Sequence, residues 1–293
     1  MSNTRIGRLG QIRIYTGKCF RTFFYEKGWK ALISTLIMGI VIAWIIGEDT
    51  FKVFENTEAG VFAMICGCIW TGLFNSIQTV CRERAIIKRE YRTGLHISSY
   101  VAAHMLFELV QCIVEAVILV VIFDIFRDFP ENGVIFDWMW LELFISFTLI
   151  TFCADCLGLL VSCVVKTENA AMTVMPFILI IQLVMCGFMF VLPDYAEPVK
   201  EVTISKWGLS AICSSADVDQ YPNNITLMKF EEAKAVNPDL EDWKSAGIEQ
   251  GDAPEYTAET DHILTCWAVL GGYCLLYGAL GTLLLKLVDK DKR

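Results

Sequence analysis

The chain alternates long apolar stretches with short charged segments. Four stretches contain no charged side chain, and they cover residues 31–47, 59–81, 170–193 and 263–285. An α-helix needs about 20 such residues to cross a hydrocarbon core of about 30 Å. Two further stretches, 100–126 and 138–165, are long and apolar but contain acidic residues. The pattern therefore predicts six transmembrane helices.

Basic residues are concentrated on one side of these spans. The segments 1–30, 82–98, 166–169 and 286–293 hold 17 of the 24 Lys and Arg residues. The other three connecting segments hold the remaining seven, together with 22 of the 33 Asp and Glu residues. Because connecting segments rich in Lys and Arg stay in the cytoplasm, we expect both ends of the chain there. Residues 193–261 then form one large extracytoplasmic loop.

Composition supports a membrane protein and excludes several other classes. Hydrophobic residues make up 55% of the 293 residues and charged residues only 19%, whereas soluble domains have about 25% charged residues. This composition and the net charge of −9 exclude a nucleic-acid partner, a disulfide scaffold and a disordered regulator. We expect a single all-α polytopic domain over residues 1–293 in a cell membrane, which in a bacterium is the inner membrane.

The 12 cysteines raise the question of metal or redox chemistry. Most of them lie within the predicted spans, where cysteine behaves as a small hydrophobic side chain. Cys153 and Cys156 have the CxxC spacing, but no second pair of ligands accompanies them, and the three histidines are scattered along the chain. We therefore expect no metal site.

Residues 8–28 precede the first predicted span and mix basic with apolar positions. Leu9, Ile12, Phe20 and Phe23 recur at approximately helical spacing, with basic residues between them. This pattern favours an amphipathic helix on the cytoplasmic surface of the membrane, with a disordered basic tail as the alternative. No apolar core of a cleavable signal peptide comes before the first span, so none is expected.

The segment after the second predicted span carries most of the information on mechanism. Residues 82–94 read RERAIIKREYRTG, with five basic and two acidic residues around Ile86, Ile87 and Tyr91. The composition predicts a short charged helix that ends at Gly94. A solvated loop has no need of these apolar residues, whereas a helix that lies on a partner protein does.

This region resembles a known family. FNSI at 74–77 and ERAIIKREYRTGLHISSY at 83–100 resemble the end of the second helix, the coupling helix and the start of the third helix in ABCG-like permeases of the ABC type-2 exporter superfamily. The resemblance extends over most of the chain, from a connecting helix within 1–30 and a coupling helix within 82–98 to the outer loop. Within that loop, SKWGLSA at 205–211 resembles the re-entrant segment of the family.

The resemblance implies a permease that dimerises with a copy or a different chain and pairs with two ATP-binding subunits. In that family the connecting and coupling helices contact the ATPase. By position, the implied contacts are Glu83, Arg89 and Glu90, with Arg13, Lys18 and Arg21. No segment of the 293 residues has the GxxxxGK[ST] pattern. We therefore expect ATP and Mg²⁺ on a partner subunit, and neither a cofactor nor a catalytic residue in this chain.

Acidic residues inside the third and fourth predicted spans form a second candidate site. His104, Glu108, Gln111 and Glu115 fall at i, i+4, i+7 and i+11, so they share one helical stripe. Glu108 and Asp155 lie at similar depths of about 12 and 15 Å by helical rise, so a hydrogen-bonded cluster of these two with His104 is geometrically possible. A structural polar network and a proton relay or cation site both remain open. Two further acids near the outer ends are expected to reach the interface: Asp124 and Glu142.

The resemblance also implies a substrate pathway, because the second and fifth helices line the central cavity in ABCG-like dimers. The corresponding residues here are Thr71, Phe74, Asn75 and Gln78 on the second helix and Leu183, Cys186, Phe188 and Met189 on the fifth. Phe188 and Met189 occupy the place of the outer gate. Ordinary helix packing uses the same residue types.

Export driven by ATP is the leading interpretation. The alternative is an ion-coupled carrier or a polytopic membrane enzyme that uses the intramembrane acids. Such carriers often contain internal repeats, and we find none between the first three and the last three spans. The sequence leaves the cargo open.

Overall fold

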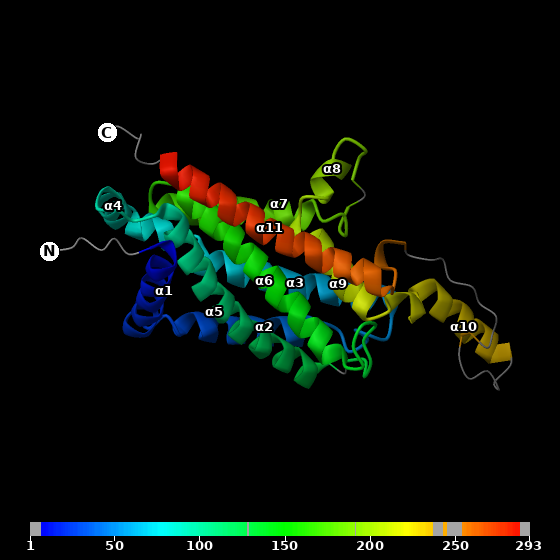
Figure 1. Ribbon diagram of the computed structural model, residues 1–293. Coiled ribbons are helices and arrows are strands. Elements are labelled where there is room, and N and C mark those ends of the chain that lie inside the picture. Colours follow the sequence, from blue (N-terminus) through cyan, green and yellow to red (C-terminus); the bar gives the residue numbers. More distant parts are fainter. Residues whose placement is uncertain (1–6, 128, 191, 237–242, 245–253, 288–293) are drawn as a thin grey trace.

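The computed structural model describes residues 7–127, 129–190, 192–236, 243–244 and 254–287. This part of the chain is helical and contains no strand. Each of the six predicted apolar stretches forms a helix, and the helices are α2 (Lys30–Ile45), α3 (Phe54–Ser76), α5 (Ile97–Phe126), α6 (Met139–Val164), α7 (Glu168–Val184) and α11 (Thr260–Leu287). The long helices lie side by side in an elongated bundle (Figure 1).

Several of these helices can cross a bilayer. In the described residues, four helical stretches are long and apolar enough, and they cover 54–92, 97–126, 139–164 and 260–286. A fifth is the pair of α1 (Arg8–Tyr25) and α2, which meet at 71°. The apolar helix α7 has only 17 residues. The chain is thus a multi-pass membrane protein, while the number of six spans and the cytoplasmic position of both ends stay predictions.

Residues 8–25 fold as helix α1, so the alternative of a disordered tail is wrong for this segment. The apolar side of α1 packs on α5, where the ring centroid of Phe107 lies 5.1 Å from that of Phe20 and 5.6 Å from that of Phe23. Lys27 adopts a left-handed φ of 57° directly after α1. This turn lets α2 leave α1 at a steep angle (Figure 1).

The centre of the bundle is the pair α3 and α6, which approach each other through glycines. A Cβ at Gly72 would collide with the carbonyl oxygen of Thr151, and one at Gly158 would collide with Ser76 Oγ. Small residues allow such close backbone contact between helices in membranes. Around this pair, α6 also contacts α5, α9 (Ile204–Ser215) and α11.

The charged segment after α3 forms helix α4 (Thr79–Arg92), as predicted. α3 and α4 together make a helical stretch of 39 residues, in which the charged residues of α4 follow the apolar part. The predicted break at Gly94 is confirmed, because this residue has a φ of 109°, which only glycine adopts readily. The next helix, α5, begins at Ile97.

The predicted outer loop contains α8 (Glu197–Lys200), α9, η1 (Val218–Gln220), α10 (Asn224–Val236) and η2 (Pro254–Tyr256). The expected short helix at 205–211 lies within α9, whose residues are almost all buried among α3, α6 and α11. Its depth in a bilayer stays a prediction. The expected loop positions 237–242 and 245–253, and positions 1–6 of the connecting segment, lie outside the described residues.

The fifth apolar stretch is shorter as a helix than the sequence predicts. α7 ends at Val184, and the chain then turns at Gly187, which has a φ of 88°. Cys186, Phe188 and Met189 therefore lie on a turn rather than on a helix. A run without charges specifies burial in apolar surroundings, but it does not require helical backbone to its end.

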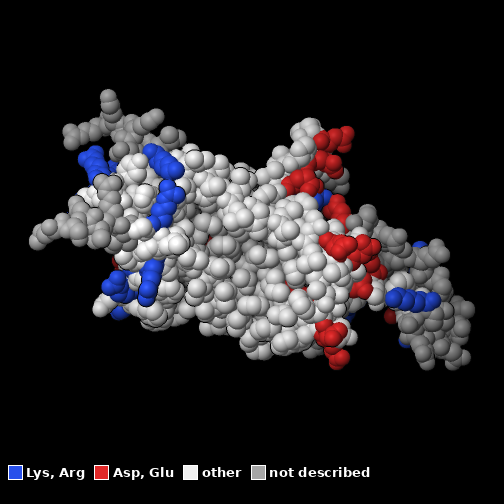
Figure 2. Space-filling view, in the orientation of Figure 1, with Lys and Arg blue, Asp and Glu red and all other residues white. Residues whose placement is uncertain are grey.

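Charge is separated along the bundle. Figure 2 shows Lys and Arg gathered over one end, where α1, α4 and the carboxyl-terminal end of α11 lie, and Asp and Glu gathered towards the other end. The surface between them is almost free of charge on this face (Figure 2). Such a band is what a hydrocarbon layer requires, and the basic end matches the side that we expect in the cytoplasm.

Candidate functional site

Helix α4 is bonded to the ends of α6 and α7. The backbone N–H groups of Val80 and Cys81 donate to Ser162 Oγ at 3.0 and 3.1 Å. The guanidinium of Arg84 donates to the carbonyl oxygen of Val165 at 2.6 Å, directly after α6. On the other side, Arg82 forms an ion pair of 3.1 Å with Glu168 in the first turn of α7.

Glu83 joins α4 to α1 and α5. Its Oε1 lies 2.8 Å from Lys18 Nζ, and its Oε2 accepts a hydrogen bond of 2.9 Å from the Tyr100 hydroxyl. His104 Nε2 lies 3.8 Å from the same Oε2. Burial alone would raise the pKa of Glu83, but the hydrogen bonds from His104, Lys18 and Tyr100 and the charge of Lys18 lower it to about 2. Glu83 is therefore ionised at neutral pH.

A second set of bonds ties α1 to the far end of α4. The hydroxyl of Tyr15 donates to Glu90 Oε2 at 2.6 Å. The side chain of Gln11 donates to the carbonyl oxygen of Gly94 at 3.1 Å and accepts from the backbone N–H of His96 at 2.9 Å. α1 therefore holds both α4 and the turn that leads into α5.

These contacts change the interpretation of the predicted coupling residues. Lys18, Glu83 and Glu90 are bonded within the chain, so they position α4 rather than projecting from it. Because all three side chains are still partly exposed, their contact with an ATPase stays a prediction. The remaining three predicted residues are exposed, with Arg89 on α4 and Arg13 and Arg21 on α1.

The outward face of α4 combines basic and apolar side chains. Ile86 is 38% exposed and Tyr91 37% exposed, and both lie among exposed arginines at positions 82, 89 and 92. Exposed apolar side chains within a charged surface are typical of sites that bind another protein, because the partner removes them from water. The outward face of α4 therefore has the composition of a docking surface.

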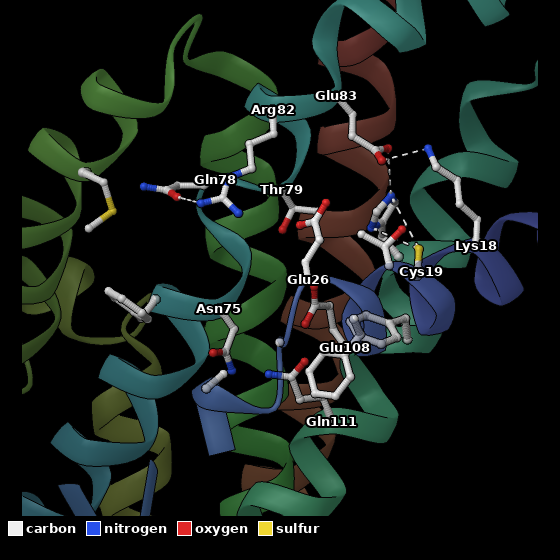
Figure 3. Close-up of a pocket in the computed structure, with 18 residues that line it drawn as sticks. Lys18, Cys19, Glu26, Asn75, Gln78, Thr79, Arg82, Glu83, Glu108 and Gln111 are labelled. Carbon is white, nitrogen blue, oxygen red and sulfur yellow. Dashed lines mark hydrogen bonds and ion pairs between the residues drawn. The ribbon is translucent and has the colours of Figure 1, made fainter. Parts of the chain in front are cut away.

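A cavity of about 350 Å³ lies behind α4, between α1, α3, α5 and α7. Its lining is formed by Lys18, Cys19, Thr22, Phe23, Glu26, Gly28, Ala31, Phe74, Asn75, Gln78, Thr79, Arg82, Glu83, His104, Phe107, Glu108, Gln111 and Met172. Figure 3 shows Lys18 and Glu83 at one end of this cavity and Asn75, Glu108 and Gln111 at the other. The cavity therefore brings together residues from three predicted sets: the contacts with the ATPase, the intramembrane polar network and the substrate pathway.

The predicted intramembrane network is buried, with the five side chains between 0% and 8% exposed. It is divided, however, and the hydrogen-bonded cluster of His104, Glu108 and Asp155 does not form. His104 lies beside Glu83 and Cys19. Asp155 accepts from the Cys112 thiol at 2.6 Å. These partners cannot be predicted from the residue spacing, because they depend on how the helices rotate against one another.

Glu115 has a separate set of partners, and both of them line the cavity. Its Oε1 accepts a hydrogen bond of 2.8 Å from Asn75 Nδ2 and one of 3.0 Å from Gln111 Nε2. Glu108 lies on the same stripe and is 4% exposed, and its Oε2 has no hydrogen-bond partner among the described residues. Glu115 and Asp155 also have one oxygen without a partner, but of these three acids Glu108 is the one that lines the cavity.

Of the two acids near the outer ends, only Asp124 is exposed. The expectation that Glu142 reaches the interface is wrong, because its side chain is fully buried. Its Oε1 accepts hydrogen bonds of 2.6 and 2.9 Å from the backbone N–H groups of Ile135 and Phe136. Glu142 thus holds the loop before α6.

The predicted pathway residues separate into two groups. Phe74, Asn75 and Gln78 line the cavity, while Thr71 does not and is 6% exposed. The predicted residues of the fifth span are not part of the cavity lining: Leu183 is half-buried, Cys186 is buried, Phe188 packs against the ring of Phe62 and Met189 is exposed. The structure of one chain therefore does not bring the two groups together.

Several cavity residues that α1 and the turn after it contribute were not among the predicted site residues. Cys19, Phe23 and Glu26 line the cavity although they belong to the connecting segment. Phe107 on α5 also lines it, packed against Phe23. The apolar spacing in α1 did predict an apolar face, but a membrane surface and a neighbouring helix satisfy the same spacing.

Comparison with known proteins identifies the family. The model of the ABC-2 type transporter family matches residues 10–215, which is more than two thirds of the chain. The ABC transporter ATP-binding/permease protein Rv1747 of Mycobacterium tuberculosis (strain ATCC 25618 / H37Rv) is 26% identical over 211 residues, which cover 68% of this chain. The chain spans about a quarter of the length of that relative (24%).

The matched residues include α4, nearly all of the helices bonded to it and the whole of the cavity lining. The resemblance noted from the α4 segment is thereby confirmed at the level of the family. With a family match over more than half of its length and a bundle of apolar helices, the chain belongs to the ABC-2 type transporter family.

Proposed function

We propose that this chain is the permease subunit of an ATP-driven exporter and that it forms the translocation pathway as a dimer with separate ATP-binding subunits. Family membership supports a permease role, since the matching domain is a membrane transport component. ATP and Mg²⁺ then bind to the partner subunits, and the basic end of the bundle faces them in the cytoplasm. In a bacterium the complex belongs in the inner membrane.

The observation that carries this proposal is the position of α4. Its outward face exposes Ile86, Arg89 and Tyr91, and its other side is bonded to α1, α5 and the end of α6. The exposed Arg82 adds an ion pair with α7. A partner that displaces α4 would therefore also displace the helices bonded to it, and several of these line the cavity. Coupling of ATP binding to a change of access requires such a connection.

Exposed apolar surface elsewhere supports a second permease half. On α7, Phe177, Ile180 and Ile181 are 63%, 56% and 51% exposed, and on α3 Trp70 and Phe74 are 42% and 45% exposed. Lipid covers part of such a surface in any membrane protein. A second subunit placed against α3 and α7 would also extend the cavity from one chain into a pathway between two.

The test compares two charge reversals at opposite ends of the bundle. Arg89→Glu changes an exposed residue of α4, and Lys52→Glu is the matched control, since Lys52 is exposed in the segment between α2 and α3. Each full-length variant is expressed in its native host and purified in dodecyl maltoside, and Mg²⁺-dependent ATP hydrolysis of the purified complex is measured.

We expect ATP hydrolysis to copurify with the wild type and with Lys52→Glu, and to fall at least about tenfold with Arg89→Glu. Absence of ATP hydrolysis from the wild-type complex, or equal activity of all three proteins, would contradict the proposal. Transport by the wild type that follows a proton gradient and needs no ATP would favour the ion-coupled carrier, for which the buried Glu108 in the cavity is the supporting observation.

A further inference from the structure

The cavity behind α4 is lined by a buried carboxyl group to which no basic side chain of the described residues is bonded. Glu108 lines the cavity and is 4% exposed, and its Oε2 has no hydrogen-bond partner among the described residues. A buried carboxylate without a partner is unfavourable, because nothing replaces the water that it loses. A cationic ligand in the cavity would remove this cost.

The basic residues of the cavity do not supply that charge. Lys18 is engaged at 2.8 Å by Glu83, and Arg82 is engaged at 3.1 Å by Glu168. Figure 3 places Lys18 and Glu83 at the end of the cavity away from Glu108. Glu26, exposed on the chain that follows α1, adds a further acid to the lining. The electrostatic environment around Glu108 thus favours a cation.

Two amides beside Glu108 have a fixed orientation. Asn75 Nδ2 and Gln111 Nε2 both donate to Glu115 Oε1, at 2.8 and 3.0 Å. With the nitrogen of each amide directed to Glu115, the oxygen is the acceptor that remains on each side chain. Both residues line the cavity. A primary ammonium has three N–H donors, which match the Glu108 carboxylate and these two amide oxygens.

The remaining wall is aromatic. Phe23, Phe74 and Phe107 come from three different helices and line the same cavity. Aromatic rings attract cations through their faces and also accept an apolar chain attached to the charge. The volume of about 350 Å³ lies within the range of about 300–1,000 Å³ found for small-molecule sites.

We propose that this cavity binds a primary organic ammonium with an apolar or aromatic tail, with Glu108 as its counter-ion and Asn75 and Gln111 as further acceptors. As a binding site it is independent of the proposed ATP-driven export. That the bound cation is the cargo rests on the proposed function. The ammonium comes either from a free amine or from the head group of an ethanolamine lipid.

The test uses a charged probe and its neutral analogue, 4-phenylbutylammonium and 4-phenylbutan-1-ol. Affinity for each is measured by isothermal titration calorimetry on the full chain in dodecyl maltoside, a detergent without an ammonium group. We expect the wild type to bind the ammonium at least about tenfold more tightly than the alcohol. A tenfold ratio of dissociation constants corresponds to about 1.4 kcal/mol, which a charge-assisted hydrogen bond can supply.

Glu108→Gln removes the charge at similar volume, and Asp124→Asn is the matched control on the same helix, since Asp124 is exposed and does not line the cavity. We expect Glu108→Gln to reduce the preference for the ammonium to less than about twofold. Asp124→Asn should keep the wild-type preference within about twofold. Thermal unfolding of each variant shows whether it is folded.

Equal affinity of the wild type for the two probes would overturn the proposal without reference to any variant. Retention of the ammonium preference by folded Glu108→Gln would also overturn it. Competition by added phosphatidylethanolamine, with none by phosphatidylglycerol, supports a lipid head group as the natural ligand, and competition by neither supports a free amine. Because no ATP-binding subunit is present in this assay, a failure here leaves the proposed export untouched.

Discussion

The contact between Lys18 and Glu83 allows a quantitative test of how α1 holds α4. We consider Lys18→Met and Glu83→Gln, separately and combined. The two charged groups lie 2.8 Å apart, and their side chains are 34% and 21% exposed. Exposed ion pairs contribute about 0.2–1 kcal/mol, whereas removal of one partner from a fully buried pair costs about 3–5 kcal/mol. For this half-buried pair we expect a coupling energy of about 1–2 kcal/mol.

The two single variants should differ, because Glu83 has further partners. Glu83→Gln also weakens the hydrogen bond from Tyr100 and the contact with His104, each worth about 0.5–1.5 kcal/mol. We expect Lys18→Met to cost about 1–2 kcal/mol and Glu83→Gln about 2–3 kcal/mol. The double variant should cost little more than Glu83→Gln alone.

The measurement is thermal unfolding of the full chain in detergent, where each kcal/mol shifts the midpoint by roughly 2–4 °C. Arg89→Gln is the control, since Arg89 is exposed on the same helix, and it should change stability by less than about 0.5 kcal/mol. If the effects of the two single variants simply add to within about 0.5 kcal/mol, the two side chains do not act as a pair and the reasoning is wrong.

The pH at which this test is done follows from the lowered pKa of Glu83. The pKa falls from 4.5 to about 2, so the ionised form stabilises the folded state. That contribution is fully present above about pH 4.5 and is lost as the pH falls towards 2. Measurements at neutral pH therefore report the whole effect of Glu83.

Two further predictions concern the fold around the site. Gly72→Ala should lower the free energy of unfolding by at least about 2 kcal/mol, because the new Cβ collides with the backbone oxygen of Thr151. Gly272→Ala is the control: its Cβ meets nothing within 4 Å, so the change should be neutral or stabilising by up to about 1 kcal/mol. Equal shifts of the thermal midpoint for the two variants would refute this packing argument. Glu142→Ala should cost about 2–3 kcal/mol in thermal unfolding, because two backbone N–H groups at 135 and 136 lose their acceptor. Glu142→Gln keeps one oxygen for them and should cost less than half as much, so an equal loss from both variants would contradict the proposed bonds.

The local features of the fold follow from the sequence. The length and apolar character of each stretch predict a helix, and a helix forms in all six. The charged composition of α4 and the glycine after it also predict where this helix ends, because glycine readily adopts the positive φ that Gly94 has there. The end of α7 could not be predicted in this way, since apolar residues continue past Val184 into a turn.

The spacing of residues in α4 also indicates the direction of its side chains. Val80, Glu83, Ile87 and Glu90 fall at i, i+3, i+7 and i+10, which is a single helical stripe. Val80 and Ile87 are buried, so the two acids between and after them also face inward. A stripe with two large aliphatic residues predicts the side that packs, and it therefore predicts that Glu83 and Glu90 serve contacts within the chain.

The partners of the buried acids could not be predicted, because they depend on the rotation of one helix against another. Glu108 and Asp155 have similar depths in the sequence analysis, but Asp155 finds the Cys112 thiol and Glu108 faces the cavity. The depth of a side chain follows from its position along one helix, whereas contact between two side chains also depends on how their two helices are rotated against each other. Only tertiary structure provides that angle.

The two ends of the cavity are held by different helices. At one end Glu83 belongs to α4, and it reaches α1 and α5 through side chains only. At the other end Asn75 of α3 and Gln111 of α5 meet on Glu115, inside the bundle. A displacement of α4 by a docked partner would therefore change the Glu83 end first, while the acceptors around Glu108 keep their positions. Access to the cavity could therefore change while the groups proposed to bind the cation keep their arrangement.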